Sequence, residues 1–219
     1  MDLKQFLRES MKRNEEEMKQ LMMQERQEKI NEIVKNSGLP RRFRSKTFKN
    51  YERGENLIAY KKARSFAENF PEVKKGLLLV GPVGTGKTHL AAAISNQLIS
   101  KLYSVYFGNT TDIMSFIKST YSKDAEMTEG EAIELMTEKV DLLVIDDLGK
   151  ENETENTLSV LYQIINKLYE NEKPVVITTN FNSSDLARKL GERGPAMVSR
   201  ITGMCEPVIL TGEDWRLKE

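Results

Sequence analysis

The chain has 219 residues, a length that fits one main domain with a short extension. Its 33 basic and 33 acidic residues cancel, which argues against a protein that coats nucleic acid by net charge, although a local basic stripe is compatible with it. One cysteine and one histidine exclude a disulfide framework and a cysteine-based zinc site. With no apolar run near the roughly 20 residues that span a bilayer, and no signal-peptide core at its start, we expect a cytoplasmic protein without a membrane partner.

The first 35 residues are rich in Glu, Lys, Arg, Gln and Met and contain no Gly or Pro. Their apolar residues recur with the spacing of one helix face: Leu3, Phe6, Leu7, Met11, Met18, Leu21, Met22, Ile30, Ile33 and Val34. Such a helix either packs on its own domain or binds a partner protein, because Met side chains adapt to a foreign groove. Ser37-Gly38-Leu39-Pro40 is expected to end it. We therefore divide the chain into a helical extension (1–36), a linker (37–53) and a main domain (54–219).

Residues 40–50 are basic and contain Phe43 and Phe48. Basic and aromatic residues together are typical of single-stranded nucleic-acid binding. The same composition suits a linker that is fixed to the domain by its two phenylalanines, and we favour that interpretation. Residues 55–70 then show the apolar spacing of a helix.

From residue 76 onward, predicted strands alternate with predicted helices. The strands are expected at 76–80, 104–107, 141–145, 174–178 and 208–210, and the helices at 89–100, 111–121, 129–138, 157–170 and 184–190. Ser183 or Ser184 is expected to cap the last of these helices. The alternation predicts an α/β domain in which helices cover both faces of a central, mostly parallel five-stranded sheet, a three-layer sandwich preceded by the N-terminal helix.

The strongest motif lies between the first strand and the helix after it. It reads Gly81-Pro82-Val83-Gly84-Thr85-Gly86-Lys87-Thr88 and fits the P-loop pattern in full. Small residues let the backbone wrap a phosphate, and the helix adds its positive N-terminal end. Lys87 would reach the β and γ phosphates and Thr88 would coordinate Mg²⁺. We predict that ATP and Mg²⁺ bind here. His89, beside the loop, is a further candidate contact; the alternative is that it is an ordinary helix residue without a role in binding.

Polar residues follow two later strands of the predicted sheet. Asp146 and Asp147 come after four buried apolar residues, and Asn180 follows the next strand. Because ligands bind at the carboxyl ends of parallel strands, we expect all three at the ATP site. Asp146 would hold Mg²⁺, Asp147 would orient or deprotonate the attacking water, and Asn180 would bind that water or the γ phosphate.

Arginines near the end of the chain are candidates for stabilising the charge that develops on phosphate. Arg200 and Arg216 are the two that we single out. The sequence leaves open which of them reaches a phosphate, and whether it does so in its own subunit.

These motifs together resemble those of AAA+ ATPases, and among them the bacterial replicative-helicase loaders of the DnaC/DnaI type. The resemblance covers about residues 39–217 and also includes Phe48 and Tyr51, the segment TDIM at 111–114, TTN at 178–180, GER followed by SRI, and the closing GEDWR. It implies Walker A at Lys87 and Thr88, Walker B at Asp146 and Asp147, and sensor 1 at Asn180. It further implies an arginine finger at Arg200 that reaches a neighbouring subunit, and sensor 2 at Arg216.

The resemblance also implies partners and an activity. The chain would be an ATPase that forms an ATP-dependent homo-oligomer and loads the replicative DNA helicase onto single-stranded DNA during replication initiation, with residues 1–36 holding the helicase. Phe116, Lys118 and Tyr121, on or next to the helix predicted over 111–121, are the candidate DNA contacts.

Two features depart from the family's usual pattern. Many AAA+ proteins have Glu where this chain has Asp147, so we expect slow hydrolysis that is stimulated by DNA or a partner. Some loaders have a zinc-binding N-terminal domain, for which this chain lacks the cysteines. A transposition helper of the IstB type, a small-molecule kinase and a nucleotide-gated interaction protein with negligible turnover remain as alternatives, although the paired aspartates and late arginines disfavour the kinase.

Overall fold

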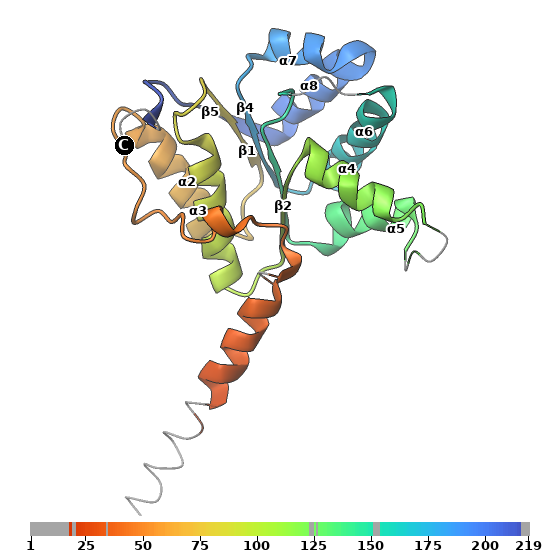
Figure 1. The fold of residues 1–219 in the computed structure, drawn as a ribbon. Coiled ribbons are helices and arrows are strands. Elements are labelled where there is room, and N and C mark those ends of the chain that lie inside the picture. Colours follow the sequence, from red (N-terminus) through yellow and green to blue (C-terminus); the bar gives the residue numbers. More distant parts are fainter. Residues whose placement is uncertain are drawn as a thin grey trace, which may run out of the picture.

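A computed structural model describes residues 18, 21–33, 35–122, 125, 127–150 and 154–215. Across these ranges a five-stranded sheet forms the centre of the protein, with strand order β2-β3-β4-β1-β5 (Figure 1). The strands are β1 (Gly76–Val80), β2 (Val105–Asn109), β3 (Leu142–Asp146), β4 (Val175–Thr179) and β5 (Cys205–Ile209). All four pairings between neighbouring strands are parallel, so the carboxyl ends of the strands meet at one edge of the sheet.

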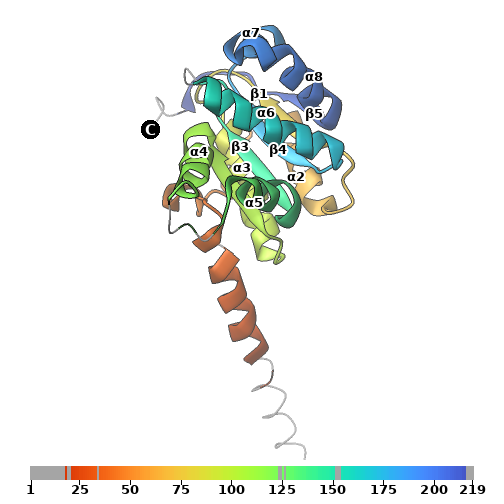
Figure 2. The same cartoon turned by 90° about the vertical axis from the view of Figure 1, so that its right-hand side faces the viewer.

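Helices cover both faces of this sheet (Figures 1 and 2). One face carries α2 (Leu57–Asn69) and α3 (Lys87–Ser100), and the other carries α4 (Thr110–Ser119), α5 (Glu129–Glu134), α6 (Glu155–Glu170), α7 (Ser183–Lys189) and α8 (Gly194–Met204). Alternate strand residues supply the two cores: Leu77 and Leu79 of β1 pack with α2 and α3, whereas Leu78 packs on the opposite side. The predicted three-layer α/β sandwich is thus confirmed.

The sequence-based element bounds hold to within a few residues, with three corrections. The helix predicted over 129–138 is α5 followed by a π-helical turn, Leu135–Lys139. The last strand begins at Cys205 rather than at residue 208. The cap of α7 is neither Ser183 nor Ser184 but Asn182, whose Oδ1 accepts the backbone N–H of Asp185 at 2.9 Å.

The helix α8 is absent from the sequence-based assignment. It contains Gly194, Pro195 and Gly203, residues that favour loops when only local propensity is considered. Pro195 lies in the first turn, where its missing N–H costs no helical hydrogen bond. Burial of Met197 and Ile201 against the sheet then offsets the weak propensity.

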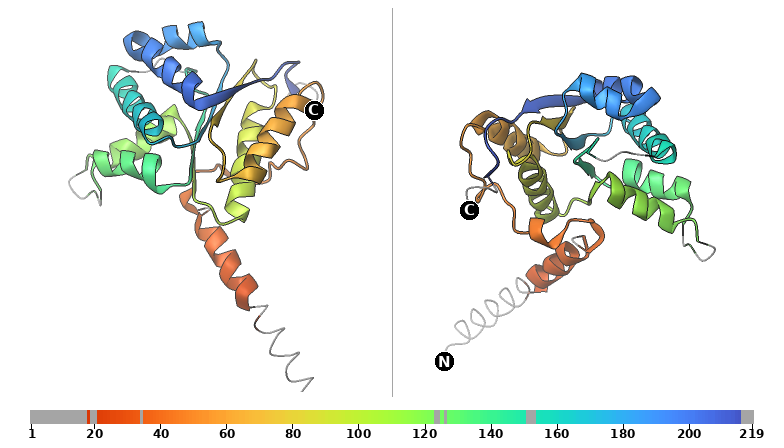
Figure 3. Two further views of the ribbon diagram at one scale, coloured as in Figure 1. Left: turned by 180° about the vertical axis from the view of Figure 1, so that it is seen from behind. Right: turned by 45° about the horizontal axis from the view of Figure 1, so that its top comes forward.

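The N-terminal helical segment leaves the body of the protein near the edge strand β2 (Figure 3). Its last turns are attached: Arg26 donates to the carbonyl oxygen of Ser100 at 2.8 Å, and Ile30 and Ile33 pack against the core. Farther out, four apolar side chains are 50% to 61% exposed: Met18, Leu21, Met22 and Met23. The predicted positions Leu3, Phe6, Leu7, Met11 and Val34 lie outside the described residues, and the division at residues 36 and 53 stays a prediction.

The segment after this helix packs along the face of the sheet that α3 covers. Leu39 and Phe48 are buried, and the Phe43 ring lies 5.9 Å from that of Phe107, centroid to centroid. The backbone N–H of Phe107 also donates to the carbonyl oxygen of Ser37 at 2.7 Å, which occupies part of the open edge of β2. No helix in the described ranges is long and apolar enough to cross a membrane.

Candidate nucleotide-binding site

The P-loop connects β1 to α3 in a conformation that requires glycine. Gly84 and Gly86 have φ values of +79° and +93°, which side-chain-bearing residues rarely adopt. A Cβ atom on Gly86 would also lie 2.8 Å from the Tyr51 ring. Gly86 is the N-cap of α3, so the first N–H groups of that helix lie at the loop without carbonyl partners inside the helix. The loop thus brings the positive end of α3 to the strand ends, as anion binding requires.

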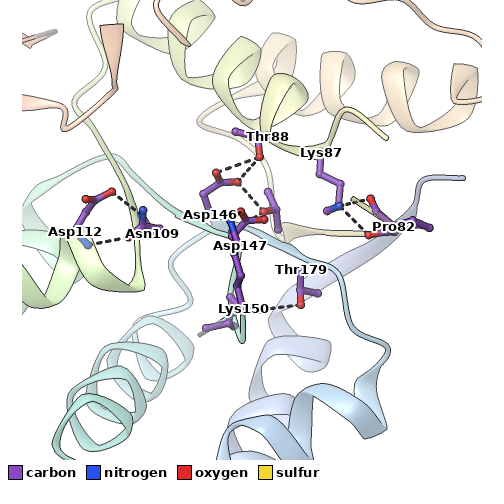
Figure 4. A network of polar contacts seen from close by, with 12 residues as sticks. Pro82, Lys87, Thr88, Asn109, Asp112, Asp146, Asp147, Lys150 and Thr179 are labelled. Carbon is purple, nitrogen blue, oxygen red and sulfur yellow. Dashed lines mark hydrogen bonds and ion pairs between the residues drawn. The ribbon is translucent and has the colours of Figure 1, made fainter. Parts of the chain in front are cut away.

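Lys87 lies within this loop and is nearly fully buried (Figure 4). Its Nζ donates to the carbonyl oxygens of Gly81 and Pro82, each at 2.7 Å. Both acceptors belong to the loop itself. The ammonium charge is therefore held against the backbone that is predicted to surround the phosphates.

Asp146, at the end of β3, is contacted by hydroxyl groups from two other elements. The Thr88 Oγ1 lies 3.0 Å and 3.1 Å from its two carboxylate oxygens, and the Thr178 Oγ1 lies 2.7 Å from Oδ1. Burial raises the pKa of Asp146 above its ordinary value, and the charge of Asp147 adds to this, while the bonds from Thr178 and Thr88 and the charge of Lys87 act in the opposite direction. A bound cation would stabilise the ionised form of such a buried carboxyl group.

Asp147 occupies an unusual backbone conformation directly after this strand. Its φ is +55°, and its backbone N–H donates to the Thr178 Oγ1 at 2.8 Å. Its carboxylate is partly exposed and forms an ion pair of 3.1 Å with the Nζ of Lys150. The predicted water-orienting carboxylate therefore has a cationic neighbour, Lys150, that belongs to none of the sequence motifs.

Asn180 follows β4 at the same edge of the sheet. Its Oδ1 is buried and has no hydrogen-bond partner among the described residues. A buried amide oxygen without a donor is costly, by about 1–3 kcal/mol. A donor from a bound molecule would satisfy it, which fits the prediction that Asn180 contacts the attacking water.

A cavity of about 570 Å³ joins these residues. That volume is in the range of small-molecule sites. Of the predicted residues, its lining includes Val83, Gly84, Gly86, Lys87, Thr88, His89, Asp146, Asp147 and Asn180, whereas Gly81, Pro82 and Thr85 are not among the described lining residues. The other lining residues are Arg42, Phe43, Ser45, Lys46, Lys150 and Trp215. The second group was not predicted. The sequence predicts a linker over residues 40–50, and no motif relates its two cavity-lining cations, Arg42 and Lys46, to the P-loop.

His89 attaches part of that segment to α3. Its Nε2 lies 3.1 Å from the carbonyl oxygen of Thr47 and 3.2 Å from the Oδ1 of Asn50. The imidazole packs edge-on against Tyr51, and burial lowers its pKa. These contacts give His89 a structural role beside its position on the cavity wall.

Arg200 lies away from this cavity, on α8. Its Cζ is 5.2 Å from the ring centroid of Tyr162 and 6.0 Å from that of Tyr169, both on α6. One terminal nitrogen donates to the carbonyl oxygen of Ala196, whereas Nε is buried and has no partner among the described residues. Arg216, the other predicted arginine, lies outside the described residues.

The three candidate DNA contacts differ in exposure. Phe116 packs against Tyr106 with a centroid distance of 5.6 Å, while Lys118 is exposed and Tyr121 is 52% exposed. The Tyr121 hydroxyl donates to Glu129. Two of the three side chains are therefore on the surface, and the third has a packing role.

The protein oxygen atoms at this site suit Mg²⁺ better than a metal ion whose ligands all come from the protein. In the described part of the chain, no three His, Cys, Asp or Glu side chains are grouped to hold a metal. Magnesium is commonly held by one or two protein oxygens together with phosphate and water. Thr88 and Asp146, 3.0 Å apart at the P-loop, supply such a pair.

Comparisons with known proteins agree with this geometry. The family model described as "IstB-like ATP binding protein" matches residues 8–219. The replicative helicase loader DnaC of Escherichia coli (strain K12) is 33% identical over 167 residues, which cover 75% of this chain and 67% of DnaC. A crystal structure of the DnaC helicase loader has a TM-score of 0.67 at 30% identity, and the match covers 78% of this chain and 100% of that one.

A third likeness is to the replication initiator DnaA bound to AMPPCP and single-stranded DNA. Its TM-score is 0.64 at 28% identity, over 77% of this chain and 50% of that one. The predicted P-loop AAA+ fold and the resemblance to DnaC-type loaders are confirmed by these matches. The chain belongs to the IstB-like ATP-binding proteins and is an AAA+ protein homologous to DnaC.

Proposed function

We propose that this protein is an ATP-dependent loader that places a replicative DNA helicase on single-stranded DNA. The observation that carries the proposal is the cavity at which the P-loop, Asp146 and Asn180 converge. The homology to DnaC supports the assignment to helicase loading. The protein shares its fold with DnaA in a structure that contains AMPPCP and single-stranded DNA. This likeness supports ATP and single-stranded DNA as its ligands.

In this proposal the P-loop side of the cavity binds ATP. Lys87 and the N-terminal end of α3 hold the β and γ phosphates. Thr88 and Asp146 hold Mg²⁺, which neutralises phosphate charge when it is bound. His89, on the cavity wall, keeps the segment around Thr47 closed over the site.

The opposite side of the cavity acts on the attacking water. Asp147 and Asn180 orient that water toward the γ phosphate. Asp147 is one methylene shorter than Glu, and its carboxylate is engaged by the Nζ of Lys150 at 3.1 Å rather than free to orient a water. We therefore expect slow hydrolysis that DNA or the helicase accelerates by rearranging this pair.

Assembly completes the site. Arg200 contributes its charge to the nucleotide of a neighbouring subunit, so ATP binding drives homo-oligomer formation. Arg216 contributes as the sensor 2 arginine. The N-terminal region 1–36 binds the helicase through its methionine-rich face. Phe116 and Lys118 of α4, together with Tyr121 just after that helix, face single-stranded DNA. The complex works in the cytoplasm.

A second candidate function is a helper ATPase in transposition. The observation that favours it is the family model itself, whose description names IstB-like proteins and which matches residues 8–219. It uses the same ATP site with a transposase as partner. The partner protein therefore distinguishes the two functions.

The test is helicase loading onto single-stranded DNA circles, which have no ends for spontaneous threading. We expect the wild-type chain with ATP to load the helicase, and the Lys87→Ala variant to fail. Lys74→Ala removes an exposed lysine outside the site and serves as the matched control. Loading that survives Lys87→Ala would contradict the proposal. Affinity capture of a transposase, and not of a helicase, would replace it with the transposition function.

A further inference from the structure

Thr178 is a fully buried hydroxyl residue on β4 that contacts both aspartates of the nucleotide site. Its Oγ1 donates to the Oδ1 of Asp146 at 2.7 Å and accepts the backbone N–H of Asp147 at 2.8 Å. A hydroxyl has one hydrogen to donate and lone pairs to accept with. One side chain therefore fixes the carboxylate of the first aspartate and the backbone of the second.

The sheet register brings Thr178 to this position. Ile145 of β3 is aligned with Ile177 of β4, so the next residue of each strand, Asp146 and Thr178, is adjacent at the strand ends. Strand order puts β3 directly beside β4, although about 30 residues of chain separate the two positions. The contact thus depends on the pairing of β3 with β4, which the local motif TTN at 178–180 does not by itself indicate.

The bond to Asp147 holds a backbone conformation that is otherwise unfavourable. A φ of +55° is uncommon for a residue with a side chain and is energetically unfavourable. The hydrogen bond from Asp147 N to Thr178 offsets part of that cost. It also determines the direction in which the chain leaves β3, and with it the position of the Asp147 carboxylate next to Lys150.

The two hydroxyl groups on Asp146 have different tasks. Thr88 comes from the P-loop side and is itself a predicted magnesium ligand. Thr178 comes from the sheet, where it has no exposed surface and no access to a bound ion. It is therefore the donor that remains on the carboxylate while Thr88 engages the metal.

The neighbouring residue Thr179 shows that this function is specific to one position. It is equally buried, and its Oγ1 donates to the carbonyl oxygen of Leu148 at 2.8 Å (Figure 4). The same oxygen accepts the backbone N–H of Phe181 at 3.2 Å. These bonds connect the two loops without contacting either aspartate. Thr179 is a structural tie, whereas Thr178 is bonded to the groups expected to act on magnesium and water.

We propose that Thr178 is a positioning residue that orients Asp146 for Mg²⁺ and Asp147 for the attacking water. The inference rests on the magnesium site of the proposed function, and it does not depend on which protein is the partner. Groups that hydrogen-bond a metal ligand typically change metal affinity by 10- to 100-fold when they are removed. Loss of the Thr178 hydroxyl should have an effect of that size.

The test measures the Mg²⁺ concentration that gives half-maximal binding of a fluorescent ATP analogue. We expect Thr178→Val to raise that concentration on the order of 10- to 100-fold. Thr178→Ser, which keeps the hydroxyl, should restore it to within about threefold of the wild type. Binding of the analogue in EDTA should change less than about twofold in both variants, because the P-loop contacts remain.

Thr137→Val is the control for loss of a buried threonine hydrogen bond. Thr137 is fully buried and bonds the carbonyl oxygen of Ile133, away from the cavity. It should lower the melting temperature without moving the Mg²⁺ midpoint. If Thr178→Val does not fold, Thr178→Cys, with its weak thiol donor, makes the same test and should also raise the midpoint.

Two results would overturn the inference. One is an unchanged Mg²⁺ midpoint in folded Thr178→Val or Thr178→Cys, and the other is an equal shift in Thr137→Val. A wild-type chain that binds the analogue without any Mg²⁺ dependence would remove the metal site and the inference together. Failure of helicase loading with normal Mg²⁺ dependence would contradict the helicase-loader function alone and leave Thr178 in its role.

Discussion

Lys87 and Arg200 are two cations predicted to act on the same phosphates, but they lie in different parts of the fold. Lys87 is buried in the P-loop, on the face of the sheet that α2 and α3 cover, and lines the nucleotide cavity. Arg200 lies on α8, which packs on the other face of the sheet. It is not among the described residues that line the cavity. The phosphate-binding loop thus lies within one chain. Arg200, in contrast, is held by the rings of Tyr162 and Tyr169 on α6.

This difference suggests a division between binding and turnover. Everything that the P-loop needs to bind a phosphate comes from consecutive residues of one chain. The charge that stabilises transfer would come from a second copy, if Arg200 acts as proposed. Substitutions on the two sides should therefore affect different measurements.

The largest effect is expected from Lys87→Ala. It removes the buried ammonium and leaves the carbonyl oxygens of Gly81 and Pro82 without that donor. The variant also loses the proposed hydrogen bond from this ammonium to a phosphate oxygen. Since a hydrogen bond between charged groups contributes about 1.5–3 kcal/mol, ATP affinity should fall on the order of 100-fold. Titration with a fluorescent ATP analogue measures the loss, and Lys74→Ala should leave the affinity unchanged.

Arg200→Ala should separate turnover from binding. We expect kcat for ATP hydrolysis, in the presence of DNA, to fall on the order of 100-fold, as happens when one donor to a developing negative charge is lost. At protein concentrations too low for assembly, ATP affinity should stay within about twofold of the wild type, because Arg200 is not among the described residues that line the cavity of its own chain. A loss of affinity as large as that of Lys87→Ala would place both cations in one site and remove the distinction between them.

Arg200→Lys is the matched variant for that experiment. Lysine keeps the positive charge but lacks the planar group that stacks on Tyr162 and Tyr169. We expect it to leave most of the defect uncorrected. Full activity in Arg200→Lys would mean that charge alone is sufficient and that the tyrosine contacts do not matter.

The smallest effect should come from Tyr162→Leu. The guanidinium of Arg200 lies 5.2 Å from this ring, and such contacts contribute about 0.5–1 kcal/mol at partly exposed sites. Hydrolysis should therefore slow by roughly two- to fivefold at unchanged ATP affinity. Tyr162→Phe keeps the ring and should behave like the wild type in the same steady-state assay. Equal defects in both variants would assign the effect to the hydroxyl group instead.

The sequence was most informative where function depends on neighbouring residues. The P-loop is a contiguous motif between a strand and a helix, and the structure has both where they were expected. Asp146, Asp147 and Asn180 were predictable as polar groups at strand ends, and parallel pairing brings them to one edge. Their functional roles remain predictions.

Contacts that depend on strand order and packing were not predictable. Thr178 meets Asp146 only because β4 lies beside β3, and Arg42 and Lys46 reach the cavity only because Phe43 and Phe48 pack their segment on the domain. Helix α8 was missed because its glycines and proline favour a loop locally, whereas burial decides the outcome. In each case the deciding contact comes from a part of the chain that is distant in sequence.

Mixing two variants with complementary defects tests whether Arg200 completes the nucleotide site of a second copy. The Lys87→Ala subunit binds ATP only weakly but presents Arg200, whereas the Arg200→Ala subunit binds ATP but lacks the arginine. Co-purification through a tag on one variant first establishes that mixed oligomers form. If Arg200 acts on a second copy, the mixture should hydrolyse ATP well above the sum of the separate variants. Mixed oligomers with no more activity than that sum would contradict a role for Arg200 between subunits.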